Sequence, residues 1–292
     1  MQIKEVLDKT IKFFKDKGFE SPRLHAELLL AHSLKIERIQ LYLKFEQLLN
    51  EKQLADAREL VKRYVAGEPV AYIVGERGFF GHVFKVGPGV LIPRPETEHL
   101  VEEAVEWMKK NPSDKFPVVD LGCGSGCIGL SVLKANPAAF LVAVDISETA
   151  LKYARENAEA LGVSDRCRLV LADAENADLI LTELKKDGFD KINLLLSNPP
   201  YISESDLEVQ KSVKDFEPAE ALFAQEDGLA KLRKWSKLYL PFLSQPGLML
   251  MEMGYQQGPD MKKHFDELKF QRVAITKDLS GHDRIIRGEI HG

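Results

Sequence analysis

The sequence has few cysteines, no long apolar run and no excess of positive charge. Cysteine occurs only as Cys123, Cys127 and Cys167 in 292 residues, and this odd set fits neither a disulfide framework nor a paired zinc site. No stretch approaches the roughly 18 uninterrupted apolar residues that a membrane span needs. With 40 Lys and Arg against 45 Asp and Glu, the formal net charge is −5, so no global positive field holds nucleic acid nonspecifically.

The chain also lacks internal repeats, low-complexity segments and an apolar signal core near its first residue. Its composition, 45% hydrophobic and 29% charged, is typical of a globular protein with a sizeable core. Together these features predict a cytoplasmic protein with reduced thiols. They predict no metal and no membrane partner, and we expect no direct nucleic-acid contact, although the net charge does not exclude a local basic patch.

The first segment, residues 1–74, is predicted to be a small helical domain. Apolar residues recur there at helical spacing: Ile3, Val6, Leu7, Ile11 and Phe14. A second helix begins at Ser21-Pro22, with Ser21 as N-cap and Pro22 in the first turn, and further helical patterns cover 37–45 and 51–66. The segment is nearly neutral and has no cluster of titratable residues, which favours a docking role over a reaction centre.

A β-hairpin is predicted to link this domain to the rest of the chain. Residues 75–92 alternate aromatic and β-branched residues with glycines, and Pro93-Arg94-Pro95 ends the pattern, so the linking segment is 75–95. A helix then begins at Glu96 and ends near Lys110. We therefore place the boundaries of the third and largest domain at 96–292.

Strands and helices alternate from Phe116 onward. Short apolar runs predict the strands 117–122, 140–145, 168–173, 191–198 and 247–253, a terminal pair over 270–278 and 282–290, and helices over 127–135, 148–161 and 227–240. This order predicts an α/β fold with a doubly wound, mostly parallel sheet. Ligands of such sheets bind beyond the carboxyl ends of the strands, so the turns after the first, second and fourth strands matter most.

A glycine-rich turn follows the first of these strands. It reads Asp120-Leu121-Gly122-Cys123-Gly124-Ser125-Gly126, where glycines let the backbone approach a ligand and the next helix offers free N–H groups. Asp145 ends the second strand and can accept both ribose hydroxyls of an adenosine-type cofactor. Gly124, Gly126 and Gly129 also satisfy the dinucleotide pattern, so the turn alone does not exclude a hydride-transfer enzyme. The frame D-x-G-x-G-x-G is similar to the S-adenosylmethionine loop of class I methyltransferases, with Asp120 suited to the amine of that cofactor.

The turn after the fourth strand reads Asn198-Pro199-Pro200-Tyr201. Consecutive prolines fix φ and remove two backbone donors, so the loop is stiff and presents acceptors, the Asn198 side-chain oxygen and the Pro199 carbonyl. These two acceptors suit a planar –NH2 group with Tyr201 packed on its π-face. For methyl transfer, the nitrogen of this group must lie in line with an activated methyl group. Its hydrogen bonds to the two acceptors become stronger as positive charge develops on the nitrogen. A dehydrogenase has no use for this loop.

With these motifs the chain resembles the protein-(glutamine-N5) methyltransferase family, and within it the release factor glutamine methyltransferases. The resemblance spans nearly the whole sequence and includes Gly67-Glu68-Pro69, Tyr72, Gly75, the segment Leu91 to Glu98, the glycine loop, Asp145, Asn198 to Ile202, Glu217-Pro218, Ala221-Leu222, Asp278-Leu279 and Asp283-Arg284.

The resemblance implies a class I S-adenosylmethionine-dependent methyltransferase without a metal. The cofactor-binding residues it implies are Gly122, Cys123, Gly124, Ser125, Gly126, Asp145, Asp173, Ala174 and Asn198. Asn198, Pro199, Pro200 and Tyr201 would hold the substrate, the glutamine of the Gly-Gly-Gln loop of class 1 peptide chain release factors, with Asn198, Pro199 and Tyr201 catalytic. The helical domain and hairpin would grip the release factor.

Three alternatives stay open at this point. The relatives that methylate a ribosomal-protein glutamine, and the adenine-N6 nucleic-acid methyltransferases, share the tetrapeptide, and a chain that only binds the cofactor and a partner is a third possibility. The Pro-Arg-Pro-Glu-Thr-Glu segment favours the release factor, and the net charge of −5 disfavours nucleic acid.

Some single residues keep two interpretations. Arg94 and Glu98 suit either the cofactor pocket or a salt bridge at the domain joint. Some family members carry an aromatic residue beside the acid after the third strand, where this chain has Asp173-Ala174, so the residue that stacks on adenine stays unassigned. Trp107 and Trp235 fall in helical patterns and are interpreted as packing residues.

Overall fold

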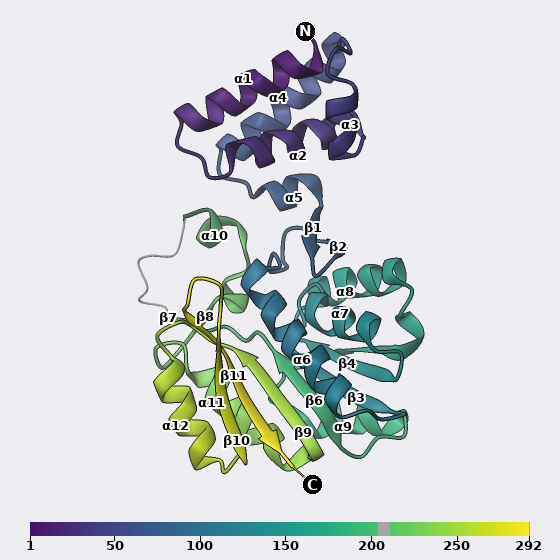
Figure 1. Ribbon diagram of the computed structural model, residues 1–292, viewed down its shortest axis with the longest axis vertical. Coiled ribbons are helices and arrows are strands. Elements are labelled where there is room, and N and C mark those ends of the chain that lie inside the picture. Colours follow the sequence, from purple (N-terminus) through teal and green to yellow (C-terminus); the bar gives the residue numbers. More distant parts are fainter. Residues whose placement is uncertain (204–210, 292) are drawn as a thin grey trace. The chain divides into compact units, whose positions relative to one another are not determined.

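The computed structural model describes residues 1–203 and 211–291, and the chain folds into two compact units (Figure 1). The first unit comprises Met1–Glu76 together with Gln210–Phe216. The second unit comprises Arg77–Val209 and Glu217–Gly292. Among the described residues, no helix is long and apolar enough to cross a membrane.

The first unit is helical, as predicted. Its helices are α1 (Ile3–Asp16), α2 (Pro22–Leu34), α3 (Arg38–Leu43), α4 (Glu51–Val65), α5 (Val70–Val74) and α10 (Lys211–Phe216). Phe14 and Tyr64 meet in its core with ring centroids 4.9 Å apart, and both side chains are buried. Ser21 occupies the N-cap position of α2, but it has φ +45° and its side chain makes no capping hydrogen bond.

A seven-stranded sheet forms the centre of the second unit within the part of the chain that the structure describes. Its order is β10-β11-β9-β6-β3-β4-β5. The strands are β3 (Phe116–Leu121), β4 (Ala139–Asp145), β5 (Cys167–Leu171), β6 (Ile192–Ser197), β9 (Leu243–Glu252), β10 (Arg272–Lys277) and β11 (Asp283–Ile290). The five strands from β9 to β5 run parallel, and β11 pairs antiparallel with β9 and β10. The predicted doubly wound sheet is therefore confirmed.

Helices cover both faces of this sheet (Figure 1). One face packs against α6 (Glu98–Lys110), α7 (Cys127–Ala135) and α8 (Glu148–Leu161). The other packs against α9 (Ala177–Lys186), α11 (Ala230–Tyr239) and α12 (Gly258–Glu267). Every residue of β3 is buried, which explains why the central strands are near-continuous apolar runs rather than alternating ones.

The predicted hairpin consists of β1 (Glu76–Phe79) and β2 (His82–Lys85). Phe79 and Phe84 place their rings in the core beside α7 and α8. Asn157 of α8 then joins the hairpin to the glycine-rich turn, because its Nδ2 donates to the carbonyls of Lys85 (3.1 Å) and Ser125 (2.9 Å). The hairpin therefore helps to position the turn after β3. A short parallel pair, β7 (Ile202–Ser203) with β8 (Phe223–Ala224), follows the prolines after β6.

Candidate active site

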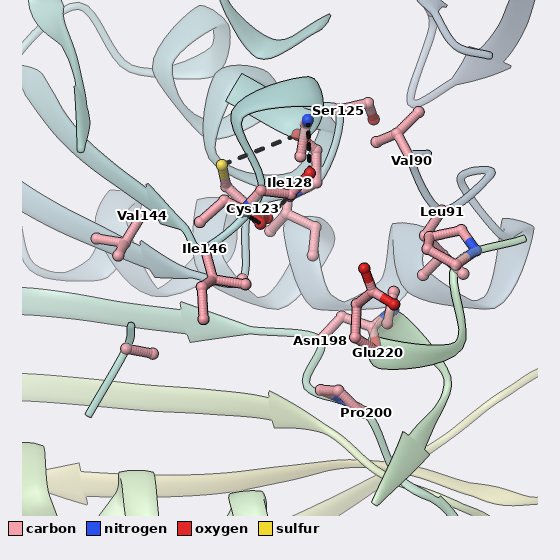
Figure 2. Close-up of a pocket in the computed structure, with 18 of the residues that line it drawn as sticks. Val90, Leu91, Cys123, Ser125, Ile128, Val144, Ile146, Asn198, Pro200 and Glu220 are labelled. Atoms are coloured by element: carbon pink, nitrogen blue, oxygen red, sulfur yellow. Dashed lines mark hydrogen bonds between the residues drawn. The ribbon is translucent and has the colours of Figure 1, made fainter. Parts of the chain in front are cut away.

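A cavity of about 320 Å³ lies at the carboxyl ends of β3, β4, β5 and β6. Its volume is within the range of small-molecule pockets, roughly 300–1,000 Å³. Most of the predicted cofactor residues line it: Gly122, Cys123, Gly124, Ser125, Asp145, Asp173, Ala174 and Asn198. Figure 2 shows Cys123, Ser125 and Ile128 on one side of this cavity. Asn198, Pro200 and Glu220 lie on another side.

The glycine-rich turn reverses the chain between β3 and α7. The backbone N–H groups of Gly122 and Cys123 both donate to the carbonyl of Val144 at 2.9 Å, which ties the turn to the neighbouring strand β4. Gly126 is the N-cap of α7 at φ +79°, and a Cβ built there would lie 2.7 Å from Cδ1 of Leu130. This position therefore requires glycine both for its backbone conformation and for space. Gly126 does not itself line the cavity.

Asp145 ends β4 at the rim of the cavity. Its Oδ2 accepts from the N–H of Gly124 at 2.8 Å and its Oδ1 from the N–H of Ser147 at 2.9 Å. These bonds orient the carboxylate and leave further lone pairs on both oxygens for hydroxyl donors. Burial raises the pKa of Asp145, and its backbone hydrogen bonds oppose that shift.

Asp120 lies beneath the turn and does not line the cavity. Its Oδ2 accepts from the N–H of Gly129 at 3.0 Å. Its Oδ1 is buried without a hydrogen-bond partner among the described residues. Burial raises the pKa of Asp120 to about 7. The structure thus places Asp145, but not Asp120, where a ligand in the cavity has direct contact.

The tetrapeptide after β6 divides between the cavity and the core. Asn198 and Pro200 line the cavity, whereas Pro199 and Tyr201 are not part of its lining. The Nδ2 of Asn198 donates to Oγ1 of Thr97 at 3.4 Å. This bond distinguishes the two ends of the amide and makes Oδ1 the end that accepts hydrogen bonds from a ligand.

A buried carboxylate, Glu252 at the end of β9, supports this arrangement. Its Oε2 accepts from Oγ1 of Thr97 at 2.6 Å, and its Oε1 accepts from the phenol of Tyr201 at 2.9 Å. Burial raises the pKa of Glu252, while the two hydroxyl donors and Arg284 lower it. Burial and the neighbouring Glu252 also raise the pKa of Tyr201, so the phenol keeps its proton and donates it. The hydrogen bonds connect Asn198 and Tyr201 through Thr97 and Glu252, and sequence patterns did not predict this network.

Arg94 both lines the cavity and forms a salt bridge. Its Nη2 lies 2.5 Å from Oε1 of Glu217, and Oε2 of the same carboxylate accepts from the N–H of Ile92 at 3.0 Å. The Glu217 side chain is only 1% exposed, so one buried carboxylate joins the proline-rich segment to the chain before β8. Glu98 has a different role, because its Oε1 accepts from the N–H of Phe80 in the hairpin turn at 3.1 Å.

Several residues of the cavity lining were missed from the sequence. Lys231 and Trp235 of α11 line it together with Asp173 and Ala174. Their spacing of four residues indicated only that they lie on the same face of a helix. No local sequence pattern shows whether such a face packs only in the core or also borders a cavity. Trp235 does both, because it is also part of the core on that side of the sheet.

The cavity suits an adenosine-type ligand with an amino acid end. The anchored Asp145 carboxylate matches a ribose, the start of α7 offers N–H groups for a carboxylate, and the lining carries apolar side chains such as Val90 and Ile146 for a purine. Within the described ranges, no group of three or more His, Cys, Asp or Glu residues is placed to hold a metal ion.

Comparisons with known proteins give one consistent result. Residues 5–75 match the family described as the PrmC N-terminal domain, and residues 101–228 match the methyltransferase small domain. The chain is 43% identical to the release factor glutamine methyltransferase of Chlorobaculum tepidum over 284 residues, which are 96% of this chain and 94% of that one. It is 38% identical to the protein of the same name from Rhodopirellula baltica over 288 residues, 97% of this chain and 95% of the relative. A solved release factor-specific protein-(glutamine-N5) methyltransferase from Alicyclobacillus acidocaldarius is 30% identical, covering 72% of this chain and all of that one with a TM-score of 0.44.

Proposed function

Because the chain belongs to the release factor glutamine methyltransferase family, we propose that it methylates the glutamine of the Gly-Gly-Gln motif in class 1 peptide chain release factors. The methyl donor is S-adenosylmethionine and the acceptor is the side-chain amide nitrogen, N5. The proposed substrate works in translation, so the proposal includes a cytoplasmic location. It also includes residues 1–74 as the docking domain, 75–95 as the linking hairpin and 96–292 as the methyltransferase domain.

The observation that carries this proposal is the orientation of Asn198. Thr97 accepts from Nδ2 of Asn198, so the Oδ1 end of the amide accepts a hydrogen bond at the border of the cavity. A substrate –NH2 group matches that acceptor. The Pro199 carbonyl is the second acceptor of the proposal: Pro199 is not itself part of the cavity lining, but it lies between Asn198 and Pro200, which are, on a segment whose consecutive prolines restrict the backbone.

The remaining residues hold the cofactor in this proposal. Asp145 accepts the ribose hydroxyls, the turn from Gly122 to Gly126 receives the amino acid end, and Asp173 faces the adenine amine. S-adenosylmethionine supplies, when bound, a methyl group that its sulfonium sulfur already activates, and it leaves as S-adenosylhomocysteine. The protein therefore does not need to activate the donor.

The protein acts on the acceptor instead. An amide nitrogen is a poor nucleophile because its lone pair is delocalised, and acceptors on its two N–H groups favour the positive charge that develops as the nitrogen–carbon bond forms. Asn198 and Pro199 also hold the nitrogen in one orientation, which removes much of the entropic cost of the reaction. The extra proton leaves the nitrogen for water after transfer. No side chain with a shifted pKa is needed as a base.

The proposal is tested by incubating the purified protein with methyl-labelled S-adenosylmethionine and the release factor of the same organism. We expect label on the release factor and none on a variant whose Gly-Gly-Gln glutamine is replaced by alanine. Ribosomal proteins, DNA and RNA serve as competing acceptors in separate reactions. Label on one of these acceptors, with none on the release factor, would contradict the proposal.

A further inference from the structure

The residue after Asp173 is too small to cover a purine. Ala174 lines the cavity with a single methyl group, and it comes directly after the acid that faces adenine in the proposed function. A flat base in water-exposed surroundings gains binding energy mainly from aromatic or apolar surface against its faces. Another element must therefore provide that surface.

The helix α11 is held directly against this part of the chain. Lys231, Trp235 and Tyr239 are spaced by four residues, so they lie on one face of the helix. The phenol of Tyr239 donates to the carbonyl of Ala174 at 2.7 Å, and Nζ of Lys231 lies 3.2 Å from Oε1 of Glu175. Both flanking side chains contact the segment after β5, and Trp235, which lies between them on the helix, lines the same cavity as Ala174 and belongs to the same buried cluster.

The indole of Trp235 extends from α11 to the glycine-rich turn. A Cβ built on Gly122 would lie 3.7 Å from Cη2 of the indole, so the six-membered ring borders the turn, and the residue as a whole is 5% exposed. Its Nε1 is buried and has no hydrogen-bond partner among the described residues. An unpaired buried donor costs stability, a cost that leucine or phenylalanine would avoid. The cation–π contact between the indole and Nζ of Lys231, 5.9 Å from the ring centroid, offsets only part of that cost.

We infer that Trp235 is the aromatic contact for the adenine base of the cofactor, supplied by α11 in place of the residue after Asp173. This inference rests on the proposed use of S-adenosylmethionine. The base lies between the ends of β4 and β5 and the face of α11 that carries Trp235. Ile146, which borders the cavity and is 64% exposed, offers a second apolar surface to the base.

The two tryptophans of the chain allow a direct test by fluorescence. Trp107 of α6 packs edge-on against Phe116, with centroids 5.7 Å apart, and does not line the cavity. We expect S-adenosylhomocysteine to quench the fluorescence of the wild type and of Trp107→Phe, in which Trp235 is the remaining tryptophan. We expect no quenching in Trp235→Phe. Adenosine, which lacks the amino acid end, should quench Trp107→Phe in the same way at higher concentration.

Calorimetry provides the second readout. We expect Trp235→Leu to weaken S-adenosylhomocysteine binding about 5- to 150-fold, the range for loss of one aromatic–base contact. Trp235→Phe, which keeps a ring, should bind within a few-fold of the wild type, and Trp107→Phe should bind unchanged. If Trp235→Leu does not fold, the fluorescence of Trp107→Phe still decides the question.

The possible failures are distinct. Wild-type protein that does not bind S-adenosylhomocysteine would contradict the proposed function itself. Wild-type protein that binds it, with unchanged fluorescence in Trp107→Phe and unchanged affinity in a folded Trp235→Leu, would overturn only the assignment of Trp235.

Discussion

Replacement of Asn198 by alanine separates catalysis from cofactor binding. The change removes the Oδ1 acceptor and leaves the hydroxyl of Thr97, which accepts from Nδ2 at 3.4 Å in the wild type, bonded to Glu252 alone. Loss of one preoriented hydrogen-bonding group at a developing charge lowers kcat about 10²- to 10³-fold, or ~2.7–4 kcal/mol. S-adenosylhomocysteine affinity should change far less, because the acceptor acts mainly as charge develops on the substrate nitrogen.

The assay is single-turnover methyl transfer to the release factor, with S-adenosylhomocysteine affinity measured in parallel by calorimetry. Asn193→Ala is a matched control on β6, the strand that leads to Asn198, since Nδ2 of Asn193 donates to Ser244 Oγ at 2.8 Å and the residue does not line the cavity. It should keep both the rate and the affinity. Equal losses of rate and affinity in Asn198→Ala would show that Asn198 is chiefly a cofactor contact and refute the reasoning.

Three further changes probe the groups around this loop. Thr97→Val removes the hydrogen bond that orients Asn198, and we expect kcat to fall about 2- to 12-fold, the effect of one ordinary hydrogen bond of ~0.5–1.5 kcal/mol, with unchanged cofactor affinity; a loss as large as that of Asn198→Ala would contradict an orienting role. Asp145→Ala should weaken S-adenosylhomocysteine binding at least about tenfold in calorimetry, as expected for loss of hydrogen bonds to a charged group, and unchanged affinity would show the ribose assignment to be mistaken. Burial raises the pKa of Asp120 from 3.8 to about 7, so the folded protein retains a proton that the unfolded chain releases between these values, and stability falls as pH rises through this window. Asp120→Asn should remove this fall in the free energy of unfolding, which is at most ~1.4 kcal/mol per pH unit. Urea unfolding of both proteins at pH 5 and pH 8 measures it. The same pH dependence in wild type and variant would contradict the raised pKa of Asp120.

The sheet and its ligand edge were predictable because local patterns determine them. Strands β3, β4 and β6 are apolar runs bounded by turn residues, and each was predicted to within a few residues of its bounds. Asp145 ends β4 and Asn198 directly follows β6. Parallel pairing of these strands with β3 brings both residues to the carboxyl-end edge of the sheet. Helix α12 was not predicted, since its apolar face is short and interrupted by charges.

The parts of the site that were missed depend on contacts between distant segments. Thr97 and Glu252 are 155 positions apart, and Glu252 looked like an ordinary charged end of a strand. Trp235 was interpreted as a packing residue, and it does pack in the core. Its place in the cavity lining together with Ala174, on a helix that the hydrogen bond of Tyr239 ties to Ala174, is seen only in the folded chain.

The most direct test of the account is a crystal structure of the protein with S-adenosylhomocysteine and a glutamine-containing peptide of the release factor, with the ligand sulfur located by anomalous scattering. We predict the sulfur at the corner formed by Asn198 and Pro199, with the glutamine amide nitrogen donating to both acceptors and facing the sulfur. A sulfur atom located away from this corner, or a glutamine bound elsewhere, would contradict the mechanism.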